Sequence, residues 1–323
     1  MALSPSLQRK AAKESLASAH KPGQVILIHT GVAMLISLIC VLADHFLAQE
    51  ISKTGGLSGM STRAFLSTAQ SVLHIFQLTF IPFWQMGYLY YTLRIAKGQP
   101  AGAGDLWEGF HRFVPITLLK LLLGILLLLL MFACSYAASF LFMMTPWAAP
   151  MLTQMETLLL EGKDYVEVTE YVMSQMQGNM LPLLIIFGVL FCVAGIFLFF
   201  FVRQAELWLL DHPNKGAFSA LIGSIRCMHR NKLGMLRIDL SFWWFYILEV
   251  LVCILSFGNV ILRSFGLFMS GDTFLTYLLF FCLYLWAQLM LYWWKRNEVA
   301  VTYAHAYLAI CPEETTEEQP TTV

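Results

Sequence analysis

The sequence predicts an all-α membrane protein, a polytopic helix bundle with about six transmembrane helices. Of its 323 residues, 58% are hydrophobic and only 12% are charged, whereas a soluble domain usually carries about 25% charged residues. Six apolar stretches each have 21 or more residues, and about 20 helical residues cross a bilayer core. Lys and Arg also concentrate in alternate connections between these stretches. Interfacial helices on the cytoplasmic side and an external helical loop between spans three and four complete the predicted fold.

The six predicted spans cover residues 25–47, 65–93, 116–144, 182–202, 235–257 and 274–294. Only a helix satisfies the backbone polar groups of such runs in lipid. The apolar core of the first run is too long for a signal peptide, and no clear cleavage site of small residues follows it. We therefore expect one transmembrane domain over residues 24–311, preceded by a cytoplasmic amphipathic tail (1–23) and followed by a disordered acidic tail (312–323).

The orientation follows from the distribution of positive charge. The N-terminal tail, the second-to-third and fourth-to-fifth connections and the C-terminal end of span six together carry sixteen Lys and Arg residues. The segments on the other side carry four, which are Lys53, Arg63, Lys163 and Arg263. Because cytoplasmic loops are enriched in Lys and Arg, both termini are predicted to be cytoplasmic in a multi-pass protein of the plasma membrane.

The connections between spans have helical patterns of their own. Residues 6–20 place apolar side chains at helical spacing, and Pro22 follows them. Residues 105–113 and 217–228 mix apolar and basic side chains, which predicts interfacial helices at the cytoplasmic headgroups. The acidic loop 146–180 repeats apolar residues at helical spacing, which predicts one or two external helices packed on the bundle.

Seven cysteines are scattered along the chain without a C-x-x-C spacing. Most of them lie in apolar runs, and no disulfide framework is visible. We therefore expect them to be small, buried apolar residues. They are Cys40, Cys134, Cys192, Cys227, Cys253, Cys282 and Cys311.

Span two carries the clearest set of polar groups at membrane depth. Six of them fall within an arc of roughly 80° at 100° per residue. They are Gln70, His74, Gln77, Gln85, Tyr88 and Thr92. One interpretation is a polar lining for a substrate or ion path. The other is hydrogen bonding between helices, which is common in membrane bundles.

Span five contains Glu249 within an otherwise apolar run, past its midpoint. An ionisable group at this depth costs about 2.5–3.5 kcal/mol on insertion scales, so it is a candidate functional residue. A proton or cation site there would need a neighbour, for which His74 and Gln288 are candidates. The alternative is a protonated Glu bonded to one neighbour. The candidate polar lining is thus His74, Gln77, Gln85, Glu249 and Gln288.

The connection before span five is the second candidate site. Gly223 and Ser224 would allow residues 217–228 to dock closely beside the entry to span five. Arg226, Arg230 and Lys232 would hold anionic lipid headgroups or a protein partner. The alternative is a solvated basic loop that only sets topology.

Motifs of catalysis are missing from the sequence. It contains no H-E-x-x-H, G-x-S-x-G or Walker A pattern. Residues 102–105 match the G-x-G-D string of intramembrane aspartyl proteases, but they lie outside every predicted span. The eight histidines show no ligand spacing. We expect no enzyme activity, no cofactor, no metal and no nucleic-acid partner.

Residues 210–248 carry a longer pattern. It begins with an Asp-x-Pro turn at Asp211, continues through Met228, Asn231 and Lys232, and ends in a Leu-Ser-Phe string followed by Trp244. This pattern resembles that of a bacterial family of polytopic membrane proteins known as domain of unknown function nine-seven-five. One departure is Arg230, where the family has Gly. The resemblance implies a membrane location and about six spans, and it implies no reaction.

The sequence thus favours an integral membrane protein without enzyme activity, either a membrane scaffold or a lipid- or partner-binding protein. The alternative is a transporter or channel for a small solute or ion, which would use the polar face of span two with Glu249. The expected partners are the lipid bilayer and, at the basic surface, anionic lipid headgroups. The sequence names no substrate and no protein partner.

Overall fold

The computed structural model describes residues 3–53, 60–146, 148–162, 164, 180–229, 231–258 and 273–311. Every regular element in these ranges is helical, as predicted. The helices are α1 (Pro5–Ser18), α2 (Pro22–Lys53), α3 (Met60–Ala96), η2 (Ala103–Trp107), α4 (Glu108–His111), α5 (Phe113–Met143), α6 (Ala149–Leu160), α8 (Met180–Val202), α9 (Ala205–Asp211), α10 (Ala217–His229), α11 (Lys232–Ser241), α12 (Trp243–Ser256), α14 (Thr273–Leu291), η3 (Tyr292–Arg296) and α15 (Asn297–Ile310).

Five continuous helical stretches in the described residues are long and apolar enough to cross a membrane. They contain α2, α3, α5, α8 and α14. A sixth candidate is the pair α11 and α12, which is bent by 65°. The predicted fifth span, residues 235–257, therefore does not form one continuous helix. The polar half, α11, carries Lys232, Arg237 and Asp239, and such groups are costly in lipid. The apolar half, α12, has 14 residues and is about 21 Å long.

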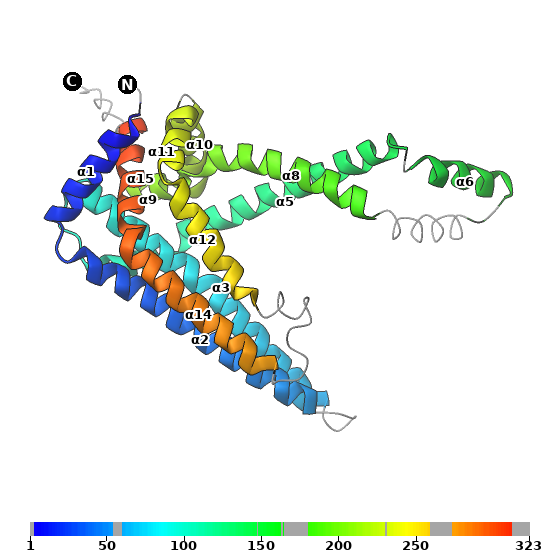
Figure 1. The fold of residues 1–323 in the computed structure, drawn as a ribbon, viewed down its shortest axis with the longest axis horizontal. Helices are drawn as coiled ribbons and strands as arrows, with labels where there is room; N and C mark the ends of the chain where they lie inside the picture. Colours follow the sequence, from blue (N-terminus) through cyan, green and yellow to red (C-terminus); the bar gives the residue numbers. More distant parts are fainter. Residues whose placement is uncertain are drawn as a thin grey trace, which may run out of the picture.

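The helices form two arms that diverge from one end of the molecule (Figure 1). In one arm α2 packs on α3 and α12 packs on α14, whereas α5 and α8 pack on each other in the second arm. The end from which both arms start holds α1, α9, α10 and α15. This arrangement gathers at one end the segments that the distribution of positive charge predicts to be cytoplasmic.

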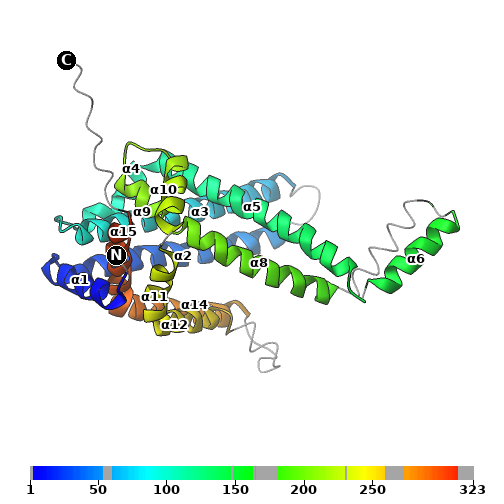
Figure 2. The same cartoon turned by 90° about the horizontal axis from the view of Figure 1, so that it is seen from above.

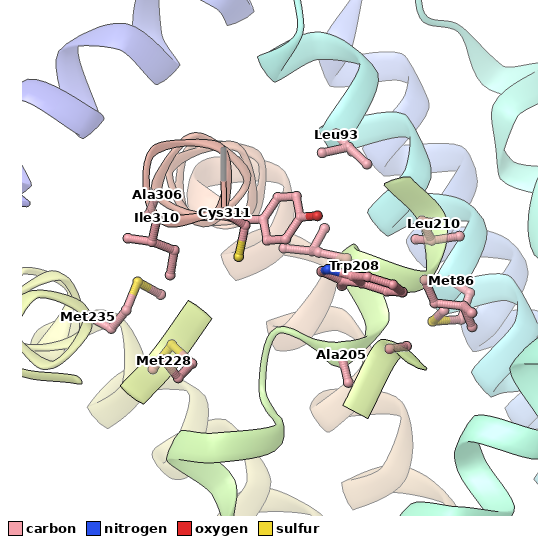
Figure 3. Packing of buried hydrophobic residues seen from close by; sticks show 14 of the residues in the cluster. Met86, Leu93, Ala205, Trp208, Leu210, Met228, Met235, Ala306, Ile310 and Cys311 are labelled. Carbon is pink, nitrogen blue, oxygen red and sulfur yellow. The ribbon is translucent and has the colours of Figure 1, made fainter. Parts of the chain in front are cut away.

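The tightest packing lies at this common end and not within the arms. Side chains of α9, α10, α11 and α15 meet there, with Trp208, Met228, Met235 and Ile310 among them (Figure 3). The arms instead expose large apolar side chains such as Leu129 of α5, which is 58% exposed. Exposed apolar surface of this extent suits contact with lipid, because lipid chains are as apolar as the side chains.

Several connections differ from the predicted pattern. The predicted helix over 105–113 is divided into η2 and α4, whereas α10 matches the predicted helix 217–228 closely. The N-terminal helix α1 packs on α15, with Ala12 fully buried. Helix α6 extends beyond the far ends of α5 and α8 and does not pack on the bundle (Figures 1 and 2). The rest of the acidic loop and the predicted disordered tail 312–323 lie outside the described residues.

The cysteine prediction was wrong at two positions. Cys227 of α10 and Cys311, which follows α15, form a disulfide with a Cα–Cα distance of 5.4 Å. They are 84 residues apart, so only the packing of α10 near the C-terminal end brings them together. Burial is also less general than expected, because Cys192, Cys253 and Cys282 are exposed in the apolar helices of the arms.

Candidate intramembrane site

A polar cavity of about 470 Å³ lies between α2, α3 and α14. Three of the predicted lining residues meet there, namely Gln77 and Gln85 of α3 and Gln288 of α14. The two α3 residues share a face because they are eight positions apart, which is slightly more than two helical turns. The packing of α14 brings the third amide to the same space.

Helix α2 contributes His29 and Thr30, which the sequence reasoning did not select. Both side chains are more than nine-tenths buried and line the cavity. His29 Nδ1 and Thr30 Oγ1 find no hydrogen-bond partner among the described residues. Buried polar atoms are normally hydrogen-bonded to protein or water, so these two atoms are suited to meet a polar molecule in the cavity. The only signal in the sequence was a polar pair within the first apolar run.

The imidazole of His29 is held in place by α3. It stacks on the Tyr88 ring with a distance of 4.5 Å between ring centres. The indole nitrogen of Trp84 donates a hydrogen bond of 2.8 Å to the backbone oxygen of His29. These contacts fix both the ring and the backbone of α2 at this point, so the wall of the cavity is preorganised.

The remaining polar groups of the lining are hydroxyls. Tyr277 and Tyr284 of α14, Tyr292 of η3 and Ser37 of α2 line the cavity. None of the described residues that line it carries a formal charge. The cavity therefore presents amides, phenols and hydroxyls, which both donate and accept hydrogen bonds.

Glu249 lies beside the cavity and not in its lining. Its carboxylate accepts a hydrogen bond of 2.8 Å from the Tyr292 hydroxyl, and Arg296 lies 3.8 Å from the same oxygen. A tyrosine of the cavity wall thus touches Glu249 directly. The partners in the structure are this tyrosine and arginine, whereas the sequence had suggested His74 or Gln288.

His74 belongs to another part of α3. Its Nε2 lies 3.3 Å from Asp44 of α2, and Gln70 donates a hydrogen bond of 2.7 Å to the same carboxylate oxygen. The polar face of α3 is thus shared between two environments. Its first part pairs with α2 through Asp44, and its middle part lines the cavity.

A short hydrogen-bond chain starts at Tyr88, which stacks on His29 of the cavity wall. Tyr88 donates a hydrogen bond of 2.7 Å to Asn297 of α15. The amide of Asn297 in turn donates one of 2.9 Å to the backbone oxygen of Pro22, where α2 begins. The chain thereby joins α3, α15 and the start of α2.

A second polar cluster lies between α8, α11, α12 and α15. Arg203 donates two hydrogen bonds of 2.7 and 2.9 Å to Asp239. The Tyr303 hydroxyl also donates to Asp239 and lies 2.5 Å from the Tyr246 hydroxyl. A cavity of about 290 Å³ adjoins this cluster and is lined in part by Arg203 and Arg296. Because its arginine is paired with a carboxylate, this cluster ties the helices together.

The second candidate site, predicted around α10, contains residues that take part in helix packing. A Cβ at Gly223 would lie 2.4 Å from the Trp208 indole, so this helix approaches α9 as closely as glycine permits. Ser224 is fully buried and donates a hydrogen bond of 2.6 Å to the backbone oxygen of Phe201. Both residues thus position α10 against its neighbours α9 and α8.

The two described basic residues of this surface, Arg226 and Lys232, have different surroundings. Arg226 lines a pocket between α9, α10 and the end of α15. Lys232 lies over the Phe201 ring, with Nζ 3.8 Å from its centre. Arg230 lies outside the described residues.

Fold and site together define a class, a multi-span helical protein with apolar helices compatible with a membrane and a polar cavity between three of them. No family model matches the chain, no curated protein matches it, and no solved structure matches it. Within the described ranges, no three His, Cys, Asp or Glu side chains are grouped as ligands for a metal ion.

Proposed function

We propose that the chain is a membrane transporter for a small, uncharged solute that forms hydrogen bonds. The observation that carries this proposal is the convergence of three amides, His29 and Thr30 on one cavity between apolar helices. Polar groups in a membrane protein are expected where a substrate path runs. The unpartnered atoms of His29 and Thr30 would be satisfied by the solute.

The volume and the lining select the class of solute. Ligand pockets typically measure about 300–1,000 Å³, and this cavity measures about 470 Å³. Gln77, Gln85 and Gln288 can each donate and accept hydrogen bonds. A polyol, or a small molecule with amide groups, offers both kinds of partner.

An ion is a poorer match than a neutral solute. The described lining carries no formal charge, and Glu249 is already held by Tyr292 and Arg296. Ion paths in membranes usually present charged groups or rings of carbonyl oxygens. Glu249 is better suited to fix Tyr292 in the wall of the cavity.

The remaining predictions complete this proposal. We propose that the protein resides in the plasma membrane with both termini in the cytoplasm, because of the uneven distribution of Lys and Arg. The pattern over residues 210–248 supports membership of the uncharacterised bacterial family that it resembles. Binding and release of a solute require no covalent step, so no enzyme activity is part of the proposal.

Solute flux in proteoliposomes tests this function. Purified full-length chain is reconstituted, and the entry of glycerol and of xylitol is followed by stopped-flow light scattering. The double variant Gln77→Ala/Gln288→Ala removes two amides from the cavity. Since each lost hydrogen bond to a buried group costs about 1–3 kcal/mol, we expect protein-dependent flux to fall at least about tenfold.

Gln70→Ala is the matched control, because it removes an amide from the same helix outside the cavity lining. This variant should retain wild-type flux. Equal flux in the double variant and the wild type would contradict the proposal. So would a wild-type flux of both polyols no greater than that of empty liposomes.

A further inference from the structure

The cavity of about 290 Å³ lies next to the solute cavity, which is the one between α2, α3 and α14. It is lined mainly by residues of α9 and α15, so we call it the α9–α15 cavity. Both helices lie at the end from which the two arms diverge (Figure 1). The distribution of Lys and Arg predicts that this end is cytoplasmic. The α9–α15 cavity is thus on the predicted cytoplasmic side of the solute cavity.

Each charged residue in the described lining of the α9–α15 cavity faces a side chain of opposite charge. The pairs are Arg203 with Asp239, Glu206 with Lys120, and Arg296 with Glu249. Paired charges are poor binding groups for an ion, because a new ion would have to displace the existing partner. The cavity is therefore better suited to a neutral molecule, as the solute cavity is.

Gln204, which lies directly before α9, gives this cavity a free polar group. The residue is only 2% exposed, and its Oε1 has no hydrogen-bond partner among the described residues. Because buried polar atoms are normally hydrogen-bonded, this oxygen is suited to accept a bond from a hydroxyl or amide of a bound molecule. Tyr246 and Tyr303 also line the cavity. An amide and two phenols thus repeat the chemistry of the solute cavity.

The two cavities meet at η3, a π-helical turn within the continuous stretch Phe274–Ile310. Such turns inside α-helices are frequent at functional sites. Tyr292, the first residue of η3, lines the solute cavity, and Arg296, the last, lines the α9–α15 cavity. The Arg296 guanidinium lies 5.0 Å from the centre of the Tyr292 ring, and Glu249 contacts both side chains. These three side chains therefore separate the two cavities.

From this juxtaposition we propose that the α9–α15 cavity is a second binding site for the transported solute, and that the contact of Tyr292, Glu249 and Arg296 closes the passage between the two sites. The inference rests on the proposed transport function. A polyol that leaves the glutamines of the solute cavity would next bind Gln204. The passage opens when the hydrogen bond from Tyr292 to Glu249 breaks and the two side chains move apart.

Polyol flux in proteoliposomes tests the second site with two variants of the full-length chain. Ala300→Leu fills the α9–α15 cavity from α15, and its flux of glycerol and xylitol should fall toward that of empty liposomes. Gln204→Met keeps a side chain of similar length and removes the unpartnered oxygen. We expect it to lower xylitol flux at least about fivefold, because one hydrogen bond to the solute is lost.

Two measurements separate a blocked site from a damaged fold. Ala309→Leu is the matched control for the filled cavity, since Ala309 lies on the same helix at an exposed position outside the lining, and it should retain wild-type flux. The melting temperature of Gln204→Met should be no lower than that of the wild type, because the lost oxygen has no partner in the described structure. A purely structural role of Gln204 would instead lower it.

The closing contact is tested by Glu249→Gln, which keeps the shape of the side chain and removes its charge. The variant weakens the attraction to Arg296, so the passage should open more often and polyol flux should rise about two- to fivefold. Glu108→Gln is the matched control. It breaks another carboxylate–arginine pair, with Arg112, outside both linings, and its flux should not change.

The results distinguish failure of this inference from failure of transport itself. If the wild type carries polyols and either Ala300→Leu or Gln204→Met carries them equally fast, the second site is overturned and the transport function stands. Wild-type flux in Glu249→Gln would overturn the closing contact in the same way. A wild-type flux no greater than that of empty liposomes would overturn both the transport function and this inference.

Discussion

Gly109 of α4 lies very close to the backbone of α3. A Cβ at this position would lie 1.9 Å from the backbone oxygen of Phe83 and 2.9 Å from the backbone nitrogen of Gly87. Backbone atoms cannot rotate away as a side chain can, so α4 would have to move off α3. The only residue that fits here without such a shift is glycine.

We therefore expect Gly109→Ala to destabilise the protein by about 1–3 kcal/mol, the usual cost of overpacking. Gly124→Ala is the matched control, since a Cβ there meets nothing within 4 Å. Thermal unfolding of the two purified variants in detergent would compare them. A melting temperature of Gly109→Ala equal to that of the control would contradict the close contact.

Residues of the cavity differ in how far the sequence could identify them. Gln77 and Gln85 could be found because helical periodicity puts them on one face of a long apolar helix. His29 and Thr30 could not, because a neighbouring pair shows no period and its importance arises from α3 and α14 packing against it. Glu249 stood out as an ion in an apolar run, but its partners depended on the packing of α12 and α14.

The N-terminal helix shows how one element is fastened to another. Arg9 of α1 lies 3.1 Å from Glu298 of α15, and Lys295 lies 2.7 Å from the other carboxylate oxygen. Ser15 and His305 are 3.0 Å apart. Burial of Glu298 opposes its ionisation, but the hydrogen bonds from Lys295 and Arg9 outweigh it and hold the pKa of the carboxyl below its ordinary value.

A lowered pKa makes this contact sensitive to acid. The folded protein binds the proton on Glu298 less readily than the unfolded chain, so the stabilisation is fully present above the unfolded pKa of about 4.3. It is lost as the pH falls through the lower folded value. We expect the melting temperature of the wild type to exceed that of Glu298→Gln at neutral pH, and the difference to shrink as the pH falls below the unfolded pKa.

The control for this element is Glu14→Gln on the outer face of α1. Glu14 and its partner Lys10 are largely exposed, and such pairs contribute little. Its melting temperature should follow that of the wild type throughout the titration. If Glu298→Gln and the wild type melt together at neutral pH, the contact does not fasten α1 to α15.

The bend between α11 and α12 is also a feature at the scale of the helices. The average hydropathy of residues 235–257 predicted one span, because this average hides the charged residues at one end of the stretch. In the structure Asp239 of α11 accepts two hydrogen bonds from Arg203. A charged pair of this kind keeps α11 with the polar end of the molecule, while α12 continues along the arm. Arg203 lies 36 residues before Asp239 in the sequence, so it is outside the stretch over which hydropathy was averaged.

At the scale of the whole molecule, the proposed orientation can be tested through the disulfide. Cys227 of α10 and Cys311, which follows α15, lie at the end that holds α1 and α15. The cytosol keeps thiols reduced. If this end is cytoplasmic, we expect both cysteines to be alkylated when intact cells are quenched with a membrane-permeant reagent. The bond should form only after the protein is purified in air, as mass spectrometry would show.

Reporter fusions give an independent measurement of the same orientation. A phosphatase joined after residue 160 should be active, because the acidic loop is predicted to lie outside, and one joined after residue 311 should be inactive. A disulfide already present in quenched cells, or the reverse pattern of fusion activity, would place the common end of the arms outside the cytoplasm.

The sequence by itself determined the fold class, the positions of the apolar helices and the polar face of α3. Each of these depends on composition or on the 3.6-residue period, which are local properties of the chain. Only the tertiary structure decided the division into two arms, the bend at α12, the Cys227–Cys311 bond and the convergence of α2, α3 and α14 on one cavity. These features join residues far apart in the chain, and their contacts depend on which helices pack together.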